Sequence, residues 1–309
     1  MLVVCRRTGR HNLIMVISKF AFRIAALAAI IGAPIWQPVR AEETATQHTS
    51  DSASCPRSTF RVVVDVGHTA ASPGADSARG VHEYEFNLDL AEAIVQSLRE
   101  AQFDRTVRLI TSGARLSSLF HRVASAKHLR ADLFLSIHHD SVPDHLKETW
   151  QYEGKKHYYS DRFSGYAIFV SNDNADHAGS LVFAHSLGQE LQKRGLHYTP
   201  HYTFSVMGRF RRELVDQEAG VYGYDHLIVL RRTPMPAVLL EAGSIVNREE
   251  ELELATPERR KIVAEAVTAA MEDFCASQGQ TVADRPAANS SGFIVTAPSQ
   301  RARPASFSR

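Results

Sequence analysis

The stretch Asp132-Leu133-Phe134-Leu135-Ser136-Ile137-His138-His139-Asp140 combines an apolar run with a polar end. The apolar part is short and uninterrupted, which is typical of a strand that is buried on both faces. Two imidazoles and a carboxylate follow where this strand must end. In an α/β sheet, ligands bind beyond the carboxyl ends of the strands. The stretch therefore predicts a central strand that carries candidate site residues, and a loop of solvated histidines is the plainer alternative.

Similar strands alternate with helical stretches along the rest of the chain. Strands are predicted at residues 60–66, 106–111, 166–171, 226–230 and 237–241, and helices at 87–101, 116–129, 180–193 and 257–274. This alternation predicts an α/β fold: a single three-layer domain with a mostly parallel twisted sheet and helices on both faces. The stretches 141–164 and 195–225 have no clear period and are predicted to be irregular.

The composition is that of an ordinary globular protein. The chain has 309 residues, of which 44% are hydrophobic and 22% charged, so it is long enough to bury a core. Its net charge of +1 gives no global sign of nucleic-acid binding. A secreted nucleic-acid binder that uses the basic run 209–212 is the weakest alternative, because such a short run is usually a solvated face.

The N-terminal residues 1–41 have the features of a secretory signal peptide. Lys19 and Arg23 precede the apolar run 24–36, which ends in a small-residue cleavage pattern. This run is too short to cross a bilayer, although an uncleaved anchor is the alternative. Met15 is the predicted initiator. We therefore expect a periplasmic or secreted protein without stable membrane insertion after cleavage.

Two changes in composition bound the predicted folded domain, residues 59–275. Residues 42–58 are rich in Ser, Thr, Ala and Glu and are predicted to form a flexible leader, and residues 276–309 a disordered tail. An exported protein permits a disulfide between Cys55 and Cys275 at the two ends of this domain. The sequence leaves open whether their Cα atoms come within bonding distance.

Three further segments bring matching side chains to the end of the central strand. His68 follows the first strand and Glu241 ends a later one, so a parallel sheet places both at the same edge as His138. Glu83 lies close to His68 on the way to the first helix. Two imidazoles and one carboxylate with an open fourth position are the ligand set of a catalytic zinc site, and a further carboxylate can serve as general base. Mg²⁺ or Ca²⁺ would need mostly oxygen ligands.

These residues also carry a family resemblance. The motifs are Asp65-Val66-Gly67-His68 with Ser72-Pro73-Gly74-Ala75, Glu83 with Asn87, Ser136-Ile137-His138, and Pro236-Ala237-Val238-Leu239-Leu240-Glu241-Ala242-Gly243 with Asn247. Their order resembles the zinc-dependent N-acetylmuramoyl-L-alanine amidases of the AmiC/CwlV type over residues 59–275. The resemblance implies that His68, Glu83 and His138 hold Zn²⁺ and that Glu241 is the catalytic glutamate. It also implies cleavage of the bond between N-acetylmuramic acid and L-alanine of peptidoglycan, during wall remodelling or cell separation.

Some residue roles remain open within this resemblance. Glu85 competes with Glu83 as the ligand, and Glu83 is favoured because the family's ligand precedes an asparagine by four residues, here Asn87. Asp140 stands where the family has an asparagine and is a candidate to orient a ligand imidazole. His139 is expected to be solvated or to support a ligand, and a structural role is expected for Arg122.

Alternative functions use the same residues. A zinc carboxypeptidase or another amidohydrolase would act on a different cell-wall amide, and an inactive wall-binding module would keep the fold without turnover. The aromatic stretch 150–163 is expected to be a surface loop, with glycan or peptide contact as the alternative. For residues 197–224 a plain loop is favoured over a gate that an activator protein displaces. The preferred stem peptide and the need for an activator remain open.

Overall fold

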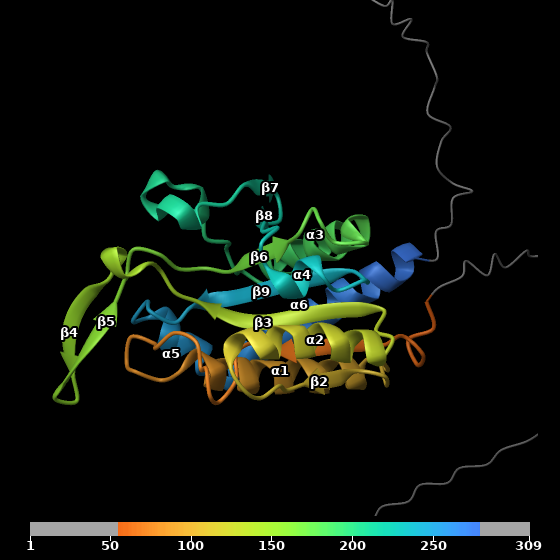
Figure 1. The fold of residues 1–309 in the computed structure, drawn as a ribbon, viewed down its shortest axis with the longest axis horizontal. Helices are drawn as coiled ribbons and strands as arrows, with labels where there is room; N and C mark the ends of the chain where they lie inside the picture. The colour runs from red at the N-terminus through yellow and green to blue at the C-terminus, as the bar shows by residue number, and fades with distance from the viewer. Residues whose placement is uncertain (1–54, 279–309) are drawn as a thin grey trace, which may run out of the picture. The chain divides into compact units, whose positions relative to one another are not determined.

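A computed structural model of the chain describes residues 55–278 (Figure 1). The predicted signal peptide, the leader up to residue 54 and the tail from residue 279 lie outside these residues. Within the described part, no helix is both long and apolar enough to cross a membrane.

The centre of the domain is a seven-stranded sheet with the order β2-β1-β3-β9-β6-β8-β7. Its strands are β1 (Val62–Val66), β2 (Val107–Leu109), β3 (Leu133–Asp140), β6 (Ala167–Val170), β7 (Leu214–Asp216), β8 (Val221–Gly223) and β9 (Ala237–Ser244). The pairs β2–β1, β1–β3, β3–β9 and β6–β8 are parallel, whereas β9–β6 and β8–β7 are antiparallel. The prediction of a mostly parallel sheet is confirmed.

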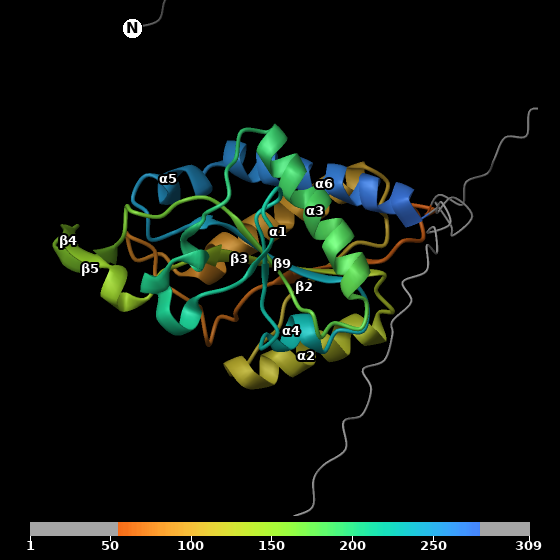
Figure 2. The same cartoon turned by 90° about the horizontal axis from the view of Figure 1, so that it is seen from above.

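Helices cover both faces of this sheet. They are α1 (Glu83–Glu100), α2 (Arg115–His128), α3 (His177–Lys193), α4 (Ile228–Arg231), α5 (Glu250–Leu254) and α6 (Pro257–Gln278). Apolar side chains of α1, α3 and α6 form one core with the sheet, and those of α2 and α4 form a second core on its other face. Figure 2 shows the sheet between these two helical layers. The predicted three-layer domain is confirmed.

The pattern of the sequence explains the central elements. β1 consists of four valines around Asp65, and all five residues are buried, as expected for a strand covered on both faces. In α1, Phe86, Leu90, Ile94 and Leu98 are buried and repeat at helical spacing. The helix begins at Glu83, one turn earlier than predicted, with two acidic residues in its first turn that favour a helix N-terminus.

The predicted strand at residues 226–230 is wrong, because Ile228–Arg231 forms the short helix α4. A short apolar run cannot distinguish a buried strand from a buried helical turn, and here Val229 and Leu230 pack into the core under α2. The two stretches predicted to be irregular also contain strands. The first holds the hairpin of β4 (Glu148–Tyr152) and β5 (Lys155–Tyr159), and the second holds β7 and β8.

The β4–β5 hairpin packs against the loop that precedes α1. The indole of Trp150 donates a hydrogen bond to the carbonyl oxygen of Ala78 at 2.8 Å. The guanidinium of Arg79 lies over the rings of Trp150 and Tyr152, and that of Arg248 lies over Tyr159. The inward aromatic rings of the hairpin are therefore used to hold it on the domain.

A disulfide joins Cys55, ahead of β1, to Cys275 in α6, and their Cα atoms are 5.1 Å apart. Cys275 is buried in the core that α6 shares with α1, and Cys55 packs against the same cluster. The pairing that the sequence left open is thus present, and it closes the domain across its two ends.

Replacing both cysteines by serine is expected to lower the free energy of unfolding by about 2–4 kcal/mol, because the bond restricts the unfolded chain. Urea unfolding of the oxidised wild type and of the Cys55→Ser/Cys275→Ser variant measures the difference. Reductant should move the wild-type midpoint to that of the variant and leave the variant unchanged. Equal midpoints without reductant would show that the bond adds no stability.

Candidate metal centre

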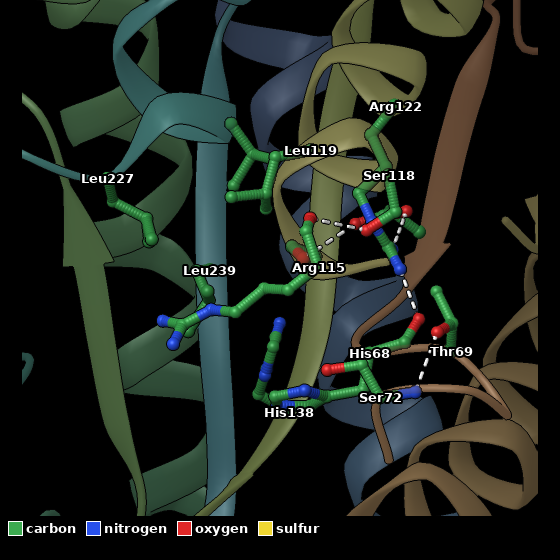
Figure 3. Close-up of a pocket in the computed structure, with 13 residues that line it drawn as sticks. His68, Thr69, Ser72, Arg115, Ser118, Leu119, Arg122, His138, Leu227 and Leu239 are labelled. Carbon is green, nitrogen blue, oxygen red and sulfur yellow. Dashed lines mark hydrogen bonds and ion pairs between the residues drawn. The ribbon is translucent and has the colours of Figure 1, made fainter. Parts of the chain in front are cut away.

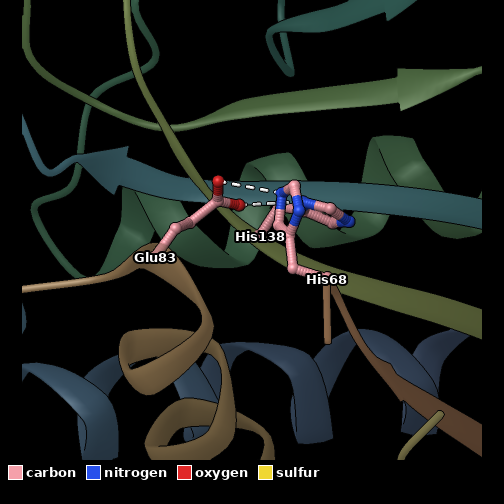
Figure 4. Close-up of side chains that lie close together, drawn as sticks. All are labelled: His68, Glu83 and His138. Carbon is pink, nitrogen blue, oxygen red and sulfur yellow. Dashed lines mark hydrogen bonds and ion pairs between the residues drawn. The ribbon is translucent and has the colours of Figure 1, made fainter. Parts of the chain in front are cut away.

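Three predicted site residues come together at the carboxyl ends of the central strands. Parallel pairing of β1 with β3 places His68, just beyond β1, beside His138. Glu83 reaches both from the start of α1: one carboxyl oxygen lies 2.9 Å from Nε2 of His68, and the other lies 2.9 Å from Nδ1 of His138. One ligand atom from each side chain lies within 4.8 Å of the others (Figure 4). The cluster presents two imidazoles and a carboxylate to one point, which suits a metal ion.

The charge states of Glu83 and His138 are those required for binding a metal ion. Burial opposes ionisation of Glu83, but hydrogen bonds from His138 and His68 outweigh burial and hold the pKa of Glu83 well below its usual range. Burial lowers the pKa of His138. An ionised carboxylate and a neutral imidazole are the forms that bind a metal. Glu85, the competing ligand candidate, is exposed and lies outside the cluster.

Two glycines leave room for the cluster. A Cβ atom at Gly67 would lie 2.4 Å from the His138 ring, and one at Gly74 would lie 2.4 Å from a carboxyl oxygen of Glu83. Gly74 also has a φ of +87°, which residues with a Cβ rarely adopt. His68 has a φ of 67°, an uncommon conformation that is often found at functional sites. The backbone is therefore shaped around the three side chains.

Arg122 of α2 holds the segment that carries His68. Its guanidinium is 2% exposed, pairs with Asp65 and donates hydrogen bonds to the backbone carbonyls of Val66 and His68. Burial raises the pKa of Asp65 to about 6, although the charge of Arg122 opposes this shift. The contacts agree with the structural role expected for Arg122, and they fix the backbone at the end of β1.

Glu241 of β9 lies beside the cluster, because its Cα is paired with that of His138 in the parallel β3–β9 register. Its Oε2 atom is buried and has no hydrogen-bond partner among residues 55–278. Burial, followed by the charges of Asp140 and Glu83, raises the pKa of Glu241 well above its usual value. A half-buried glutamate with one buried, unpartnered carboxyl oxygen, paired in the sheet with His138, is a candidate for proton transfer.

His139 and Asn87 form a second layer behind the cluster. The Asn87 amide donates to Glu83 and to the carbonyl of Gly67, both at 3.3 Å, and its oxygen is 2.8 Å from Nδ1 of His139. His139 is 3% exposed, and burial lowers its pKa to about 3. It is therefore a neutral, buried side chain that supports the Asn87 contact to Glu83, and the solvated alternative is wrong.

Asp140 bonds to a segment that the sequence did not connect with the site. Its Oδ1 accepts hydrogen bonds from the Tyr202 hydroxyl and the Ser141 amide, both at 2.7 Å, and Oδ2 lies 3.5 Å from Nε2 of His201. Asp140 contacts neither His68 nor His138 within residues 55–278, so the expected orienting role is not seen. Tyr202 and His201 lie in a stretch without hydrophobic period, and no sequence signal marked them. These contacts attach residues 197–224 to the end of β3.

Two adjoining clefts open beside the cluster. The first is lined by His68 and His138, by apolar side chains of Leu119, Leu227 and Leu239, and by Arg115 (Figure 3). The second lies between the chain after β3 and the 3₁₀ helix η3 (Ser205–Phe210). Arg115 lines both clefts. A substrate can therefore approach the cluster along a surface that includes part of the 197–224 segment.

A comparison with known protein families decides which proteins share this arrangement. Residues 62–273 match the family described as N-acetylmuramoyl-L-alanine amidase, Amidase_3. The chain belongs to this amidase family. The match includes His68, Glu83, His138 and Glu241, so the whole candidate centre lies inside the family domain. The predicted resemblance is confirmed.

Individual members of the amidase family show the extent of the similarity. N-acetylmuramoyl-L-alanine amidase AmiA of Escherichia coli K12 is 27% identical over 258 residues, which cover 79% of this chain and 86% of AmiA. The solved structure of the amidase Ami1 from Mycobacterium smegmatis has a TM-score of 0.54 at 19% identity and covers 71% of this chain and 98% of Ami1. The CwlD amidase from Clostridioides difficile, solved in complex with the GerS lipoprotein, has a TM-score of 0.52 at 16% identity and covers 71% of this chain and 99% of CwlD. The two structures share the fold.

Proposed function

We propose that this peptidoglycan amidase holds Zn²⁺ at His68, Glu83 and His138 and uses Glu241 as its catalytic carboxylate. The observation that carries the proposal is the convergence of ligand atoms from the three side chains within 4.8 Å, in a member of the N-acetylmuramoyl-L-alanine amidase family. Two imidazoles and a carboxylate suit zinc, and three protein ligands leave a position for water or substrate. The reaction is hydrolysis of the amide between N-acetylmuramic acid and L-alanine.

The residues around the cluster have distinct parts in this reaction. When bound, zinc supplies a Lewis acid that lowers the pKa of water and polarises the scissile carbonyl. Glu241, next to His138 on the neighbouring strand, takes the proton of the attacking water and delivers it to the α-amine of L-alanine. Asn87, whose amide also donates to the Gly67 carbonyl, donates to the Glu83 carboxylate and holds it in place. The products are a glycan with a free lactyl carboxylate and a stem peptide that begins with L-alanine.

The same proposal gives the compartment and partners. Peptidoglycan lies outside the cytoplasm, and the Cys55–Cys275 disulfide is typical of an oxidising compartment. We therefore propose that the protein works in the periplasm or after secretion. CwlD was solved with a lipoprotein, and this pairing supports an activator protein as a proposal for the present chain as well.

Digestion of purified sacculi tests the reaction. The wild-type protein is expected to release free stem peptides that begin with L-alanine, as mass spectrometry of the soluble fraction will show. A chelator should stop the release, and added zinc should restore it. Release of single C-terminal amino acids would instead indicate a carboxypeptidase. Binding to sacculi without any released product would indicate an inactive wall-binding module.

A further inference from the structure

The two clefts beside the metal centre share a cationic wall. Arg115, the first residue of α2, lines the cleft that contains His68 and His138, and it also lines the second cleft together with Arg209. Figure 3 shows an extended Arg115 side chain whose guanidinium points toward the strand that carries Leu239. That strand is β9, which also carries Glu241. A group that contacts Arg115 in the first cleft therefore lies in the same cleft as the ligand candidates His68 and His138.

These two arginines differ from three arginines of the domain that are paired with carboxylates. Arg122 pairs with Asp65, Arg79 with Glu251, and Arg248 with Asp161. The guanidiniums of Arg115 and Arg209 have no carboxylate partner and donate no hydrogen bond within residues 55–278, and both side chains are exposed.

The two acids that line the clefts do not neutralise Arg115 and Arg209. Asp65 in the first cleft pairs with Arg122, and Asp144 in the second pairs with Lys147 at 3.1 Å. The Arg209 guanidinium instead lies 4.9 Å from the centre of the Phe210 ring, so it is supported by an apolar face. The second cleft therefore contains two guanidinium groups, those of Arg115 and Arg209, that are free to donate hydrogen bonds to a ligand.

A guanidinium matches a carboxylate or a phosphate, because its planar fork donates two parallel hydrogen bonds to either group. The substrate of an amidase that cuts at L-alanine carries free carboxylates only on its peptide part beyond that residue. We propose that Arg115, assisted by Arg209, binds a free carboxylate of the stem peptide and makes the enzyme select stems that carry it. The proposal rests on the proposed function, since the ligand is the peptide side of that substrate.

Paired soluble substrates test this carboxylate subsite. Each pair contains the same muramoyl peptide, with either a free α-carboxylate or a carboxamide on the γ-linked D-glutamyl residue after L-alanine. Wild-type kcat/KM is expected to be about tenfold higher for the carboxylate, mainly through a lower KM. Arg115→Ala should lose this preference, so that the ratio of kcat/KM between carboxylate and carboxamide falls to about one. Arg115→Lys should retain part of the preference, because the charge remains and the fork is lost.

Arg211→Ala is the matched control, since Arg211 is exposed on the same turn as Arg209 but lines neither cleft. It should leave both rates unchanged. Equal losses on both substrates in Arg115→Ala, or no loss on either, would overturn the subsite. Calorimetry with free stem peptides that carry either the α-carboxylate or the α-carboxamide on the γ-linked D-glutamyl residue separates this outcome from failure of the proposed function. Arg115-dependent binding of the carboxylate peptide, together with no hydrolysis of the muramoyl substrates, would refute the proposed reaction and keep the subsite. Binding that does not depend on Arg115 would refute the subsite.

Discussion

Replacing Glu241 by alanine is expected to abolish turnover and to leave about one zinc ion per chain. Glu241 is paired with His138 in the sheet but is not a member of the cluster of His68, Glu83 and His138, so its loss removes no ligand. It does remove the acceptor for the proton of the attacking water. Because a positioned acid or base contributes roughly 10²–10⁴-fold, the rate on purified sacculi should fall by about that factor.

Two measurements on one preparation check this expectation. Zinc content by mass spectrometry of the purified variant should match the wild type, and release of stem peptides should be close to background. Glu241→Gln is the control, because it keeps the shape of the side chain and cannot accept the proton. An active Glu241→Ala enzyme would remove Glu241 from the reaction, and a variant without zinc would make it a ligand.

Replacing Glu83 by alanine should remove both zinc and activity. The carboxylate contacts both imidazoles at 2.9 Å and is the only acidic member of the cluster in the described chain. Even side chains that merely support a ligand change metal affinity by about 10–100-fold, so the loss of a ligand should exceed about 100-fold. Activity should fall with zinc occupancy.

Glu85→Ala provides a matched control on the same helical turn. Glu85 is exposed and lies outside the cluster, so its variant should keep wild-type zinc content and wild-type release of stem peptides. Zinc titration of both variants, monitored by competition with a chromogenic chelator, measures the two affinities. The opposite result, with zinc lost in Glu85→Ala and kept in Glu83→Ala, would exchange their roles.

Hydrophobic periodicity was enough to predict the layers of the domain. The valine-rich β1 and the uninterrupted apolar part of β3 are buried on both faces, and this burial produces their simple pattern. The residue pattern does not show whether a strand pairs in the parallel or the antiparallel direction. Nothing in the composition of β6 distinguishes its antiparallel pairing with β9 from the parallel pairing of its neighbours. The predicted strand at residues 226–230 was wrong for a related reason, because one apolar helical turn and a short strand can have the same composition.

Part of the candidate site could be predicted from the sequence, and part could not. Strand ends and motif order brought His68, His138 and Glu241 to one edge before the structure placed them there. The contacts of Asp140 could not be predicted, because Tyr202 and His201 come from a distant segment with no periodic pattern. The support that Asn87 gives to His139 and Glu83 also depends on side-chain directions that spacing alone does not fix.

The disulfide makes the polypeptide between Cys55 and Cys275 a closed covalent ring. A single backbone cut inside this ring, for example in the exposed turn at residues 153–154 of the β4–β5 hairpin, leaves one molecule rather than two fragments. The sheet then keeps its strands together through the remaining covalent path. An enzyme of this design tolerates a proteolytic nick that would separate the two halves of an open chain.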